Sequence, residues 1–324
     1  MRLNFKSIAA VLVLLSLLVC TRLTSAQQAR TELPTVAPSR LFVTVTLPDG
    51  FVTGLPRERF EVIVDKQPAR IVDFSNDDSP LSIGIVLDLS ISMSRIVDKD
   101  SSETKLKLLQ QSLRKFLEAS NKSNDYFLMT FNVKRQLMTD WTSDTSLIIE
   151  KLNGMKATGN TALFDACHDA IKELQKGRHS KRALLLISDG FDTDSKNSHS
   201  DVLKLLKETG ILLYSIDFEE RININVPYWS EGAGILVELA GISGGMAYTA
   251  KSIKTQRDTD EIFEEIAAEL RHQYTIGIEP QNGDGKFHKV KVKLNIPTDA
   301  APELKKLIVR ARPGFISPAA TRPN

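Results

Sequence analysis

Five oxygen-bearing side chains in this 324-residue sequence stand where predicted elements end or begin, a placement that suits a metal ion. Asp88, Ser90 and Ser92 form an Asp-x-Ser-x-Ser run directly after an apolar segment. Thr161 opens a helical segment, and Asp189 follows a second apolar segment in Ser188-Asp189-Gly190. In an open parallel sheet, ligands bind outside the carboxyl ends of the strands. The five side chains are therefore expected to meet at one edge of a sheet.

Together these side chains supply two carboxylates and three hydroxyls, which are all oxygen ligands. Such a set suits a hard divalent cation, Mg²⁺ most naturally, with Mn²⁺ or Ca²⁺ possible. Because few of the ligands are charged, the ion is expected to accept a further carboxylate from a partner, with waters completing its shell. Within the first loop, alternate side chains can turn toward one point while Leu89 and Ile91 are expected to anchor backward into the core.

Two other interpretations of the five residues stay open. Ser90 and Ser92 can serve as helix caps, Thr161 as an N-cap and Asp189 as a turn residue. Alternatively, the fold can hold a site that binds no metal at working concentrations. An Asp-x-Ser-x-Ser run alone is a weak signal at ordinary Asp and Ser usage. Its combination with Thr161 and Asp189 at element ends is much more specific.

The elements that must position these residues alternate between apolar strand-like runs and helical segments. Alternation of this kind, with strands that are apolar almost throughout, predicts a doubly wound α/β fold with a mostly parallel sheet and helices on both faces. Residues 136–138 are expected to add an antiparallel edge strand after a turn at Asn132. The predicted strands are 81–87, 126–131, 183–187, 211–216 and 246–249, and the predicted helices are 103–119, 161–176, 199–209, 232–240 and 257–271.

The flanking regions have a different sequence pattern, in which apolar and polar residues alternate. This pattern predicts short antiparallel strands within 41–75 and again from 274 onward. Each flank alone is marginal for independent folding, whereas both together have the size of a typical domain. We therefore predict an α/β domain, 81–271, inserted into one small β-sandwich-like domain formed by 27–80 and 272–316, followed by a flexible tail, 317–324.

The N-terminus has the layout of a secretory signal peptide, 1–26, with basic Arg2 and Lys6, an apolar run over 8–19 and small residues before Ala26. An uncleaved anchor and a lipoprotein modified at Cys20 are the alternatives. Cleavage changes the formal net charge from +2 to −1, which gives no electrostatic case for nucleic acid. The mature chain has no apolar stretch long enough to span a membrane. An exported protein, periplasmic or extracellular, is expected.

The five candidate ligands resemble the metal-ion-dependent adhesion site of von Willebrand factor A-type domains, and the resemblance covers about 81–271. It implies that Asp88, Ser90, Ser92, Thr161 and Asp189 hold the ion and that an acidic side chain of a protein ligand completes its shell. The flanks look like those of exported bacterial von Willebrand factor A-related proteins. That likeness rests on Phe60-Glu61-Val62, Tyr274-Thr275-Ile276-Gly277-Ile278 and Arg310-Ala311-Arg312-Pro313-Gly314-Phe315.

The preferred function is a non-enzymatic, metal-dependent protein-binding or adhesion module. A metal-dependent hydrolase and a structural subunit of an envelope assembly are the alternatives. Against a hydrolase, no His, Lys or Glu at motif spacing supplies a general base, and no phosphate-binding glycine loop is visible.

Three further groups of residues have a structural and a functional interpretation. Asp192 and Asp194 indicate either a solvated loop or a second cation site. Cys167 and His168 lie together on a predicted helix, but adjacent helix positions point about 100° apart, so we expect no catalytic pair and place Cys167 in the core. The lysines of the last region are expected on the solvent face of a strand, or else form a patch for an acidic partner; they are Lys286, Lys289, Lys291 and Lys293.

Overall fold

The computed structural model describes residues 39–96, 103–217, 232–249, 255–279, 283–297 and 302–317. The predicted signal peptide, 1–26, the segment 27–38 and all but the first residue of the predicted tail lie outside these ranges. No helix within them is long and apolar enough to cross a membrane.

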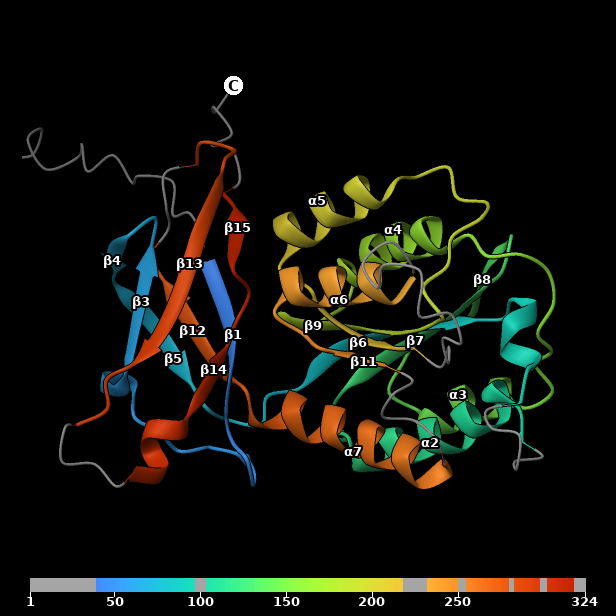
Figure 1. Ribbon diagram of the computed structural model, residues 1–324, viewed down its shortest axis with the longest axis horizontal. Coiled ribbons are helices and arrows are strands. Elements are labelled where there is room, and N and C mark those ends of the chain that lie inside the picture. The colour runs from blue at the N-terminus through green and yellow to red at the C-terminus, as the bar shows by residue number, and fades with distance from the viewer. Residues whose placement is uncertain are drawn as a thin grey trace, which may run out of the picture. The chain divides into compact units, whose positions relative to one another are not determined.

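A six-stranded sheet forms the centre of the α/β part (Figure 1). Its strand order is β11-β10-β9-β6-β7-β8, and all neighbours are parallel except β7 and β8. Residues of the three central strands are buried almost without exception, which explains why their sequence is apolar on both faces. The strands are β6 (Leu81–Asp88), β7 (Asp125–Phe131), β8 (Arg135–Thr142), β9 (Lys181–Ile187), β10 (Leu212–Ile216) and β11 (Ala247–Tyr248).

Helices cover both faces of this sheet (Figure 1). On one face, α2 (Lys105–Ala119), α3 (Thr145–Leu152) and α7 (Gln256–His272) share a core with alternate residues of β6. On the other face, α4 (Leu163–Leu174), α5 (His199–Thr209) and α6 (Gly232–Ser243) enclose a second core. The prediction of a doubly wound fold with an antiparallel edge strand is therefore confirmed.

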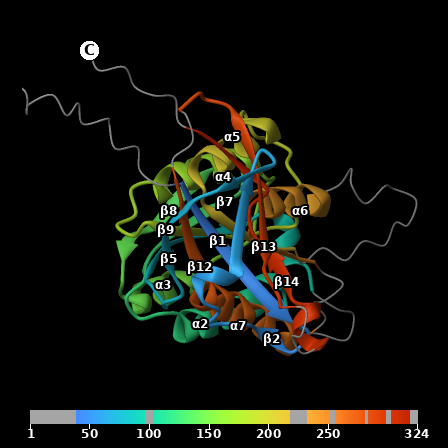
Figure 2. The same ribbon diagram turned by 90° about the vertical axis from the view of Figure 1, so that its left-hand side faces the viewer.

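Two antiparallel sheets are built from both flanks of the α/β part. Strands from opposite ends of the sequence lie side by side, as β1 pairs with β12 and with β14 (Figure 2). One sheet has the order β14-β1-β12-β5 with β2 paired to β1, and the other has the order β15-β13-β3-β4. The strands are β1 (Ser39–Leu47), β2 (Gly50–Phe51), β3 (Phe60–Val64), β4 (Gln67–Ala69), β5 (Ile71–Ser75), β12 (Tyr274–Ile278), β13 (Phe287–Leu294), β14 (Ile308–Arg310) and β15 (Gly314–Ile316).

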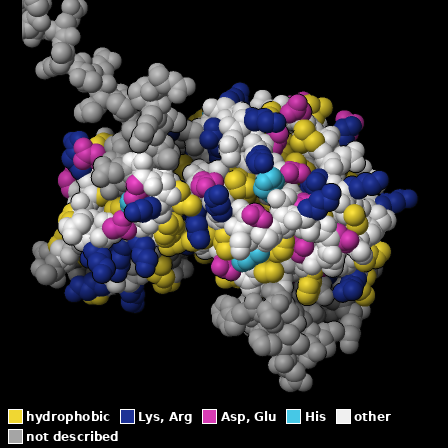
Figure 3. Space-filling view, turned by 90° about the horizontal axis from the view of Figure 1, so that it is seen from above, with side chains coloured by type: hydrophobic (Ala, Val, Ile, Leu, Met, Phe, Trp, Pro, Cys, Tyr) yellow, Lys and Arg dark blue, Asp and Glu magenta, His cyan; other side chains and the backbone are white. Residues whose placement is uncertain are grey.

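These two sheets enclose a third core, which includes Val43, Phe60 and Tyr274. Alternation places every second residue of a strand in this core and the others outside. On β13, Lys289, Lys291 and Lys293 are exposed, as the solvent-face interpretation expects. A cluster of Lys and Arg side chains lies on the surface of this part of the molecule, which also shows Asp and Glu side chains, and charges of both signs mix on the α/β part (Figure 3).

The α/β part is inserted between two paired strands. β5 ends at Ser75 and β6 begins at Leu81, while α7 ends at His272 and β12 begins at Tyr274. Ser75 is the register partner of Thr275, so the chain enters and leaves the α/β part at adjacent positions. The predicted architecture, an α/β fold inserted in a β-sandwich-like part, is confirmed.

Candidate functional site

Three loops meet at the carboxyl ends of β6 and β9, which are neighbouring parallel strands. The first loop follows β6, the second precedes α4 and the third follows β9. Their side chains line one pocket of about 370 Å³. Four of the five predicted ligands are among the lining residues, namely Ser90, Ser92, Thr161 and Asp189.

The fifth predicted ligand, Asp88, is fully buried. One oxygen of its carboxylate accepts a hydrogen bond from the backbone N–H of Ser90 at 2.7 Å, and the other accepts one from Oγ of Ser188 at 2.7 Å. The hydroxyl oxygens of Ser90 and Ser92 lie 3.0 Å apart. Asp88 therefore fixes the start of the first loop and ties it to the third. Nothing in the spacing of Ser188 in the sequence indicates this contact with Asp88.

The electrostatics of Asp88 are unfavourable when only the protein is present. Burial raises the pKa of its carboxyl group to about 6, and the nearby charge of Asp189 acts in the same direction. Hydrogen bonds from Ser90 and Ser188 oppose this shift. A cation in the adjacent pocket would offset the cost of holding buried negative charge there.

Backbone hydrogen bonds connect the first loop to the second. The N–H of Ile91 donates to the carbonyl of Gly159 at 3.0 Å, and the N–H of Thr158 donates to the carbonyl of Leu89 at 2.6 Å. Gly159 has a φ of +79°, a conformation that favours glycine. The two loops are thus held at a fixed separation by main-chain groups.

The third loop holds the second through Thr193. Its hydroxyl accepts a hydrogen bond from the N–H of Thr161 at 3.1 Å, and its own N–H donates to the carbonyl of Thr161 at 2.9 Å. The N–H of Asp194 reaches the same carbonyl at 3.1 Å. Thr193 also lines the pocket, although sequence reasoning did not select it.

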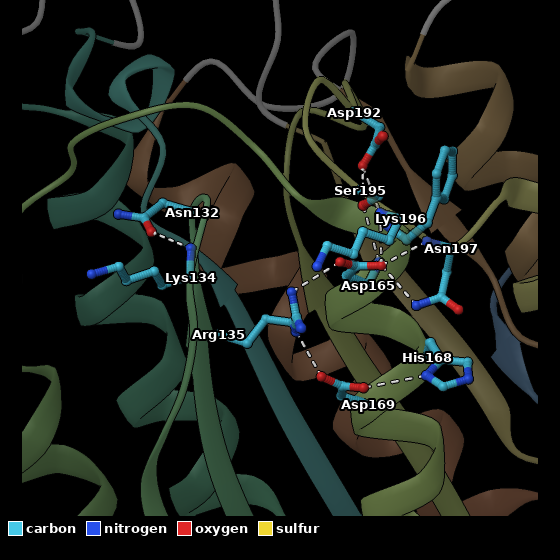
Figure 4. Close-up of polar contacts among 11 residues, drawn as sticks. Asn132, Lys134, Arg135, Asp165, His168, Asp169, Asp192, Ser195, Lys196 and Asn197 are labelled. Atoms are coloured by element: carbon cyan, nitrogen blue, oxygen red, sulfur yellow. Dashed lines mark hydrogen bonds and ion pairs between the residues drawn. The ribbon is translucent and has the colours of Figure 1, made fainter.

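A buried carboxylate on α4 anchors the rest of the third loop (Figure 4). Asp165 accepts hydrogen bonds from the backbone N–H groups of Lys196 and Asn197 at 3.1 and 2.8 Å, and Arg135 pairs with it at 3.0 Å. Burial raises the pKa of Asp165, but the hydrogen bonds from Asn197 and Lys196 and the charge of Arg135 outweigh burial and lower it below its ordinary value. Asp165 therefore acts as an ionised hub that fixes the loop.

Close backbone packing also fixes the segment after Asp189. Gly190 has a φ of +78°, and a Cβ at this position would lie 2.3 Å from the carbonyl oxygen of Gly232. Only glycine fits both constraints. The carboxylate of Asp189 is thus followed by a turn that packs directly on the start of α6.

The structure corrects one expectation about the first loop. Leu89 packs against the core, but Ile91 is 59% exposed and lines the pocket, so the prediction that Ile91 anchors in the core is wrong. Ile91 begins a short 3₁₀ helix, Ile91–Ser94. In this helix successive side chains do not alternate between the core and the pocket, as they would in an extended loop.

The alternative sites named from the sequence have structural roles. Asp192 accepts hydrogen bonds from the N–H of Phe164 and from Oγ of Ser195, and so contributes to the loop anchor. Cys167 is fully buried, as expected for a core residue, and burial raises the pKa of its thiol to about 12.

The residues at the pocket fit a hard cation by their chemistry. Within the described ranges, no group of three or more His, Cys, Asp or Glu side chains is placed to hold a metal. A cation in this pocket would therefore depend on hydroxyl oxygens together with Asp189 and the buried Asp88. Oxygen donors of this kind suit Mg²⁺ and exclude the nitrogen and sulfur sets that zinc prefers.

Comparison with known proteins identifies part of the chain. The family model for the von Willebrand factor type A domain matches residues 83–191. No curated protein matches the chain.

Several solved structures are similar to it. The conserved hypothetical protein BatB from Bacteroides thetaiotaomicron is 16% identical, with a TM-score of 0.46 over 58% of this chain and 98% of that chain. The PilB minor pilin from Streptococcus sanguinis is 15% identical, with a TM-score of 0.47 over 60% and 61%. A von Willebrand factor type A protein from Catenulispora acidiphila is 11% identical, with a TM-score of 0.47 over 82% and 71%.

The matched segment begins within β6 and ends just after β9. It includes the first and second loops, the first residues of the third and all five candidate ligands, and its strands belong to a doubly wound sheet. The chain therefore contains a von Willebrand factor type A domain.

Proposed function

We propose that this protein is a non-enzymatic, metal-dependent protein-binding module. Asp88, Ser90, Ser92, Thr161 and Asp189 would hold a divalent cation, Mg²⁺ in the first place and Mn²⁺ or Ca²⁺ as substitutes. When bound, the cation supplies the positive charge to which an acidic side chain of a protein ligand coordinates. One observation carries the proposal: four of these residues line one pocket, with the buried carboxylate of Asp88 fixed by Ser90 and Ser188.

The rigidity of the three loops supports a binding role. Main-chain hydrogen bonds join the first loop to the second, and Thr193 joins the second to the third. Hydroxyl ligands held in this way need little ordering when an ion or a ligand arrives, which reduces the entropic cost of binding.

The composition of the pocket favours binding over hydrolysis. Of its described lining residues, none is a His, Lys or Glu that could take up a proton from water. The one strongly basic side chain among its described lining residues is that of Arg95.

The proposal is tested first with the metal alone. We expect Mg²⁺ to raise the melting temperature of the wild-type protein, because an ion that binds only the folded state adds about 2.7 kcal/mol at a hundredfold excess over its dissociation constant. Asp189→Ala should abolish this effect. Asp169→Ala, which removes a carboxylate that is 40% exposed on α4 and outside the ligand set, should retain it.

The result that contradicts the proposal is equally clear. If Mg²⁺, Mn²⁺ and Ca²⁺ all leave the wild-type melting temperature unchanged, the cation site does not exist. Metal-dependent turnover of a panel of phosphate esters, lost in Asp189→Ala, would instead favour the hydrolase.

We also propose that the chain is exported, to the periplasm or the extracellular medium, after removal of residues 1–26. The proposal rests on the basic, apolar and small residues at the N-terminus. Together with the pairing of β5 and β12, it gives a β-rich domain of 27–80 and 272–316 around the domain of 81–271. N-terminal sequencing of the protein recovered from outside the cytoplasm tests the cleavage site.

A further inference from the structure

Three large apolar side chains among the described residues are exposed and lie either in the lining of the pocket or beside Gly159, which lines it. They are Ile91 at 59% exposure, Val133 at 47% and Phe191 at 40%, and we call them the apolar rim. Ile91 and Phe191 line the pocket itself. Val133 lies beside the second loop, because its Cγ2 atom is 3.9 Å from the position of a Cβ on Gly159.

The exposure of Ile91 is fixed by the backbone. Its N–H is bonded to the carbonyl of Gly159, and the neighbouring Leu89 already packs against the core beneath the loop. Ile91 thus stands beside Ser90 and Ser92, which also line the pocket. Single exposed apolar residues are ordinary, whereas several around one polar pocket are typical of an interaction surface.

The rim members come from different parts of the chain. Ile91 belongs to the first loop, Phe191 to the third, and Val133 to the turn between β7 and β8. An arrangement with polar ligands at the centre and apolar groups around them suits a partner whose charged side chain is desolvated by its own apolar neighbours.

We propose that the protein partner of this site presents an acidic side chain flanked by large apolar side chains, which pack on the apolar rim while the carboxylate enters the pocket. This inference rests on the proposed function, since it takes the acidic side chain from the cation site. It adds the chemistry of the flanking residues, which the cation does not determine.

Short fluorescent peptides provide the probe. Each carries one central glutamate, flanked on both sides either by leucine and phenylalanine or by serine, with the other residues neutral. In the presence of Mg²⁺, we expect fluorescence anisotropy to show the apolar-flanked peptide binding at least about tenfold more tightly than the serine-flanked one. Ile91→Ser and Phe191→Ser should each remove most of this preference.

Matched controls separate the rim from general effects. Val72→Ser changes an apolar residue of similar exposure, 39%, on β5 in the antiparallel sheets, and should leave the preference intact. The Mg²⁺-dependent rise in melting temperature should persist in Ile91→Ser and Phe191→Ser, because neither residue is a proposed ligand.

Each other outcome overturns the inference. Equal Mg²⁺-dependent binding of both peptides would support the cation site but show that the apolar rim does not contribute to recognition of the partner. Stabilisation by Mg²⁺ without binding of either peptide would do the same. A Mg²⁺-dependent dimer that Ile91→Ser disrupts would assign the rim to a second copy of the chain. If Mg²⁺ gives no stabilisation at all, the proposed function itself fails.

Discussion

Thr193 holds both backbone polar groups of Thr161: its hydroxyl accepts from the Thr161 N–H at 3.1 Å, and its N–H donates to the Thr161 carbonyl at 2.9 Å. The two residues are 32 positions apart in the sequence. A proposed ligand on the second loop is thus positioned by the third loop, which also carries Asp189. A displacement of the second loop is therefore expected to displace the third loop, and the reverse.

The first prediction concerns this contact. Thr193→Val removes the hydroxyl and leaves the N–H of Thr161 without its acceptor, a loss of about 1 kcal/mol for a partly exposed hydrogen bond. We expect Mg²⁺ affinity, measured by isothermal titration calorimetry, to fall roughly fivefold. Thr193→Ser keeps the hydroxyl and should behave like the wild type. Equal affinity in the valine and serine variants would mean that Thr193 does not position Thr161.

A second prediction compares two carboxylates that share Arg135. The side chain of Asp165 is 4% exposed and accepts backbone N–H groups of the third loop, whereas that of Asp169 is 40% exposed. Asp165→Ala should lower the free energy of unfolding by about 2–4 kcal/mol, because buried donors lose their acceptor. Asp169→Ala should change it by less than about 0.5 kcal/mol. Urea denaturation measures both, and similar losses would show that Asp165 is not the hub.

The third prediction concerns the turn after Asp189. Gly190 and Gly154 have nearly the same positive φ, +78° and +79°, but a Cβ on Gly154 would meet nothing within 4 Å. Gly154→Ala should therefore cost only the conformational strain, about 1 kcal/mol. Gly190→Ala should cost more than about 3 kcal/mol, since it also collides with the backbone of Gly232. It should also weaken Mg²⁺ binding, whereas Gly154→Ala should not. Thermal denaturation with and without Mg²⁺ checks both statements.

A fourth prediction concerns pH. His288 on β13 lies 2.7 Å from Asp65 and 3.1 Å from Asp284. Burial lowers the pKa of His288, but its hydrogen bonds to the two carboxylates outweigh burial and raise it above the ordinary value. Protonated His288 therefore stabilises the fold fully below the pKa of an unfolded histidine, about 6.5. That contribution is lost as pH rises through the raised pKa of the folded state.

The stability difference between the wild type and His288→Gln should accordingly be largest in mildly acidic buffer and shrink as pH increases. Urea denaturation between about pH 5.5 and pH 8.5 covers the range in which histidine titrates. A difference that is constant over this range would show that the ion pairs of His288 contribute nothing that depends on its charge.

Much of the α/β part could be predicted because its signals are local. β6, β7 and β9 are runs of apolar residues, and α5 is bounded by a capping box at Ser198 and by Gly210 in the left-handed conformation. α3 was not predicted, since only two of its eight residues, Ile148 and Leu152, are buried and its apolar face is short. Alternation predicted strands in the flanks, but their pairing partners depend on contacts between distant residues.

The candidate site shows the same limit. Asp88, Ser90, Ser92, Thr161 and Asp189 were found from their spacing and their places at element ends. Ser188 and Thr193 were not, because their roles are contacts across 100 and 32 residues that leave no periodic signal. The exposure of Ile91 was missed for a related reason, since a 3₁₀ turn directs side chains differently from the extended loop that was assumed.

The pairing of β5 with β12 has a mechanical consequence. These strands carry the chain into and out of the α/β part, and their hydrogen bonds close residues 76–274 into a loop. A pulling force applied between Ser39 and Ser317 therefore runs through the antiparallel strands and bypasses the closed loop. Only after the β5–β12 ladder has been torn would tension reach the three loops at the pocket. When such a force acts while a ligand is bound, the three loops at the pocket would be the last part of the fold to be extended.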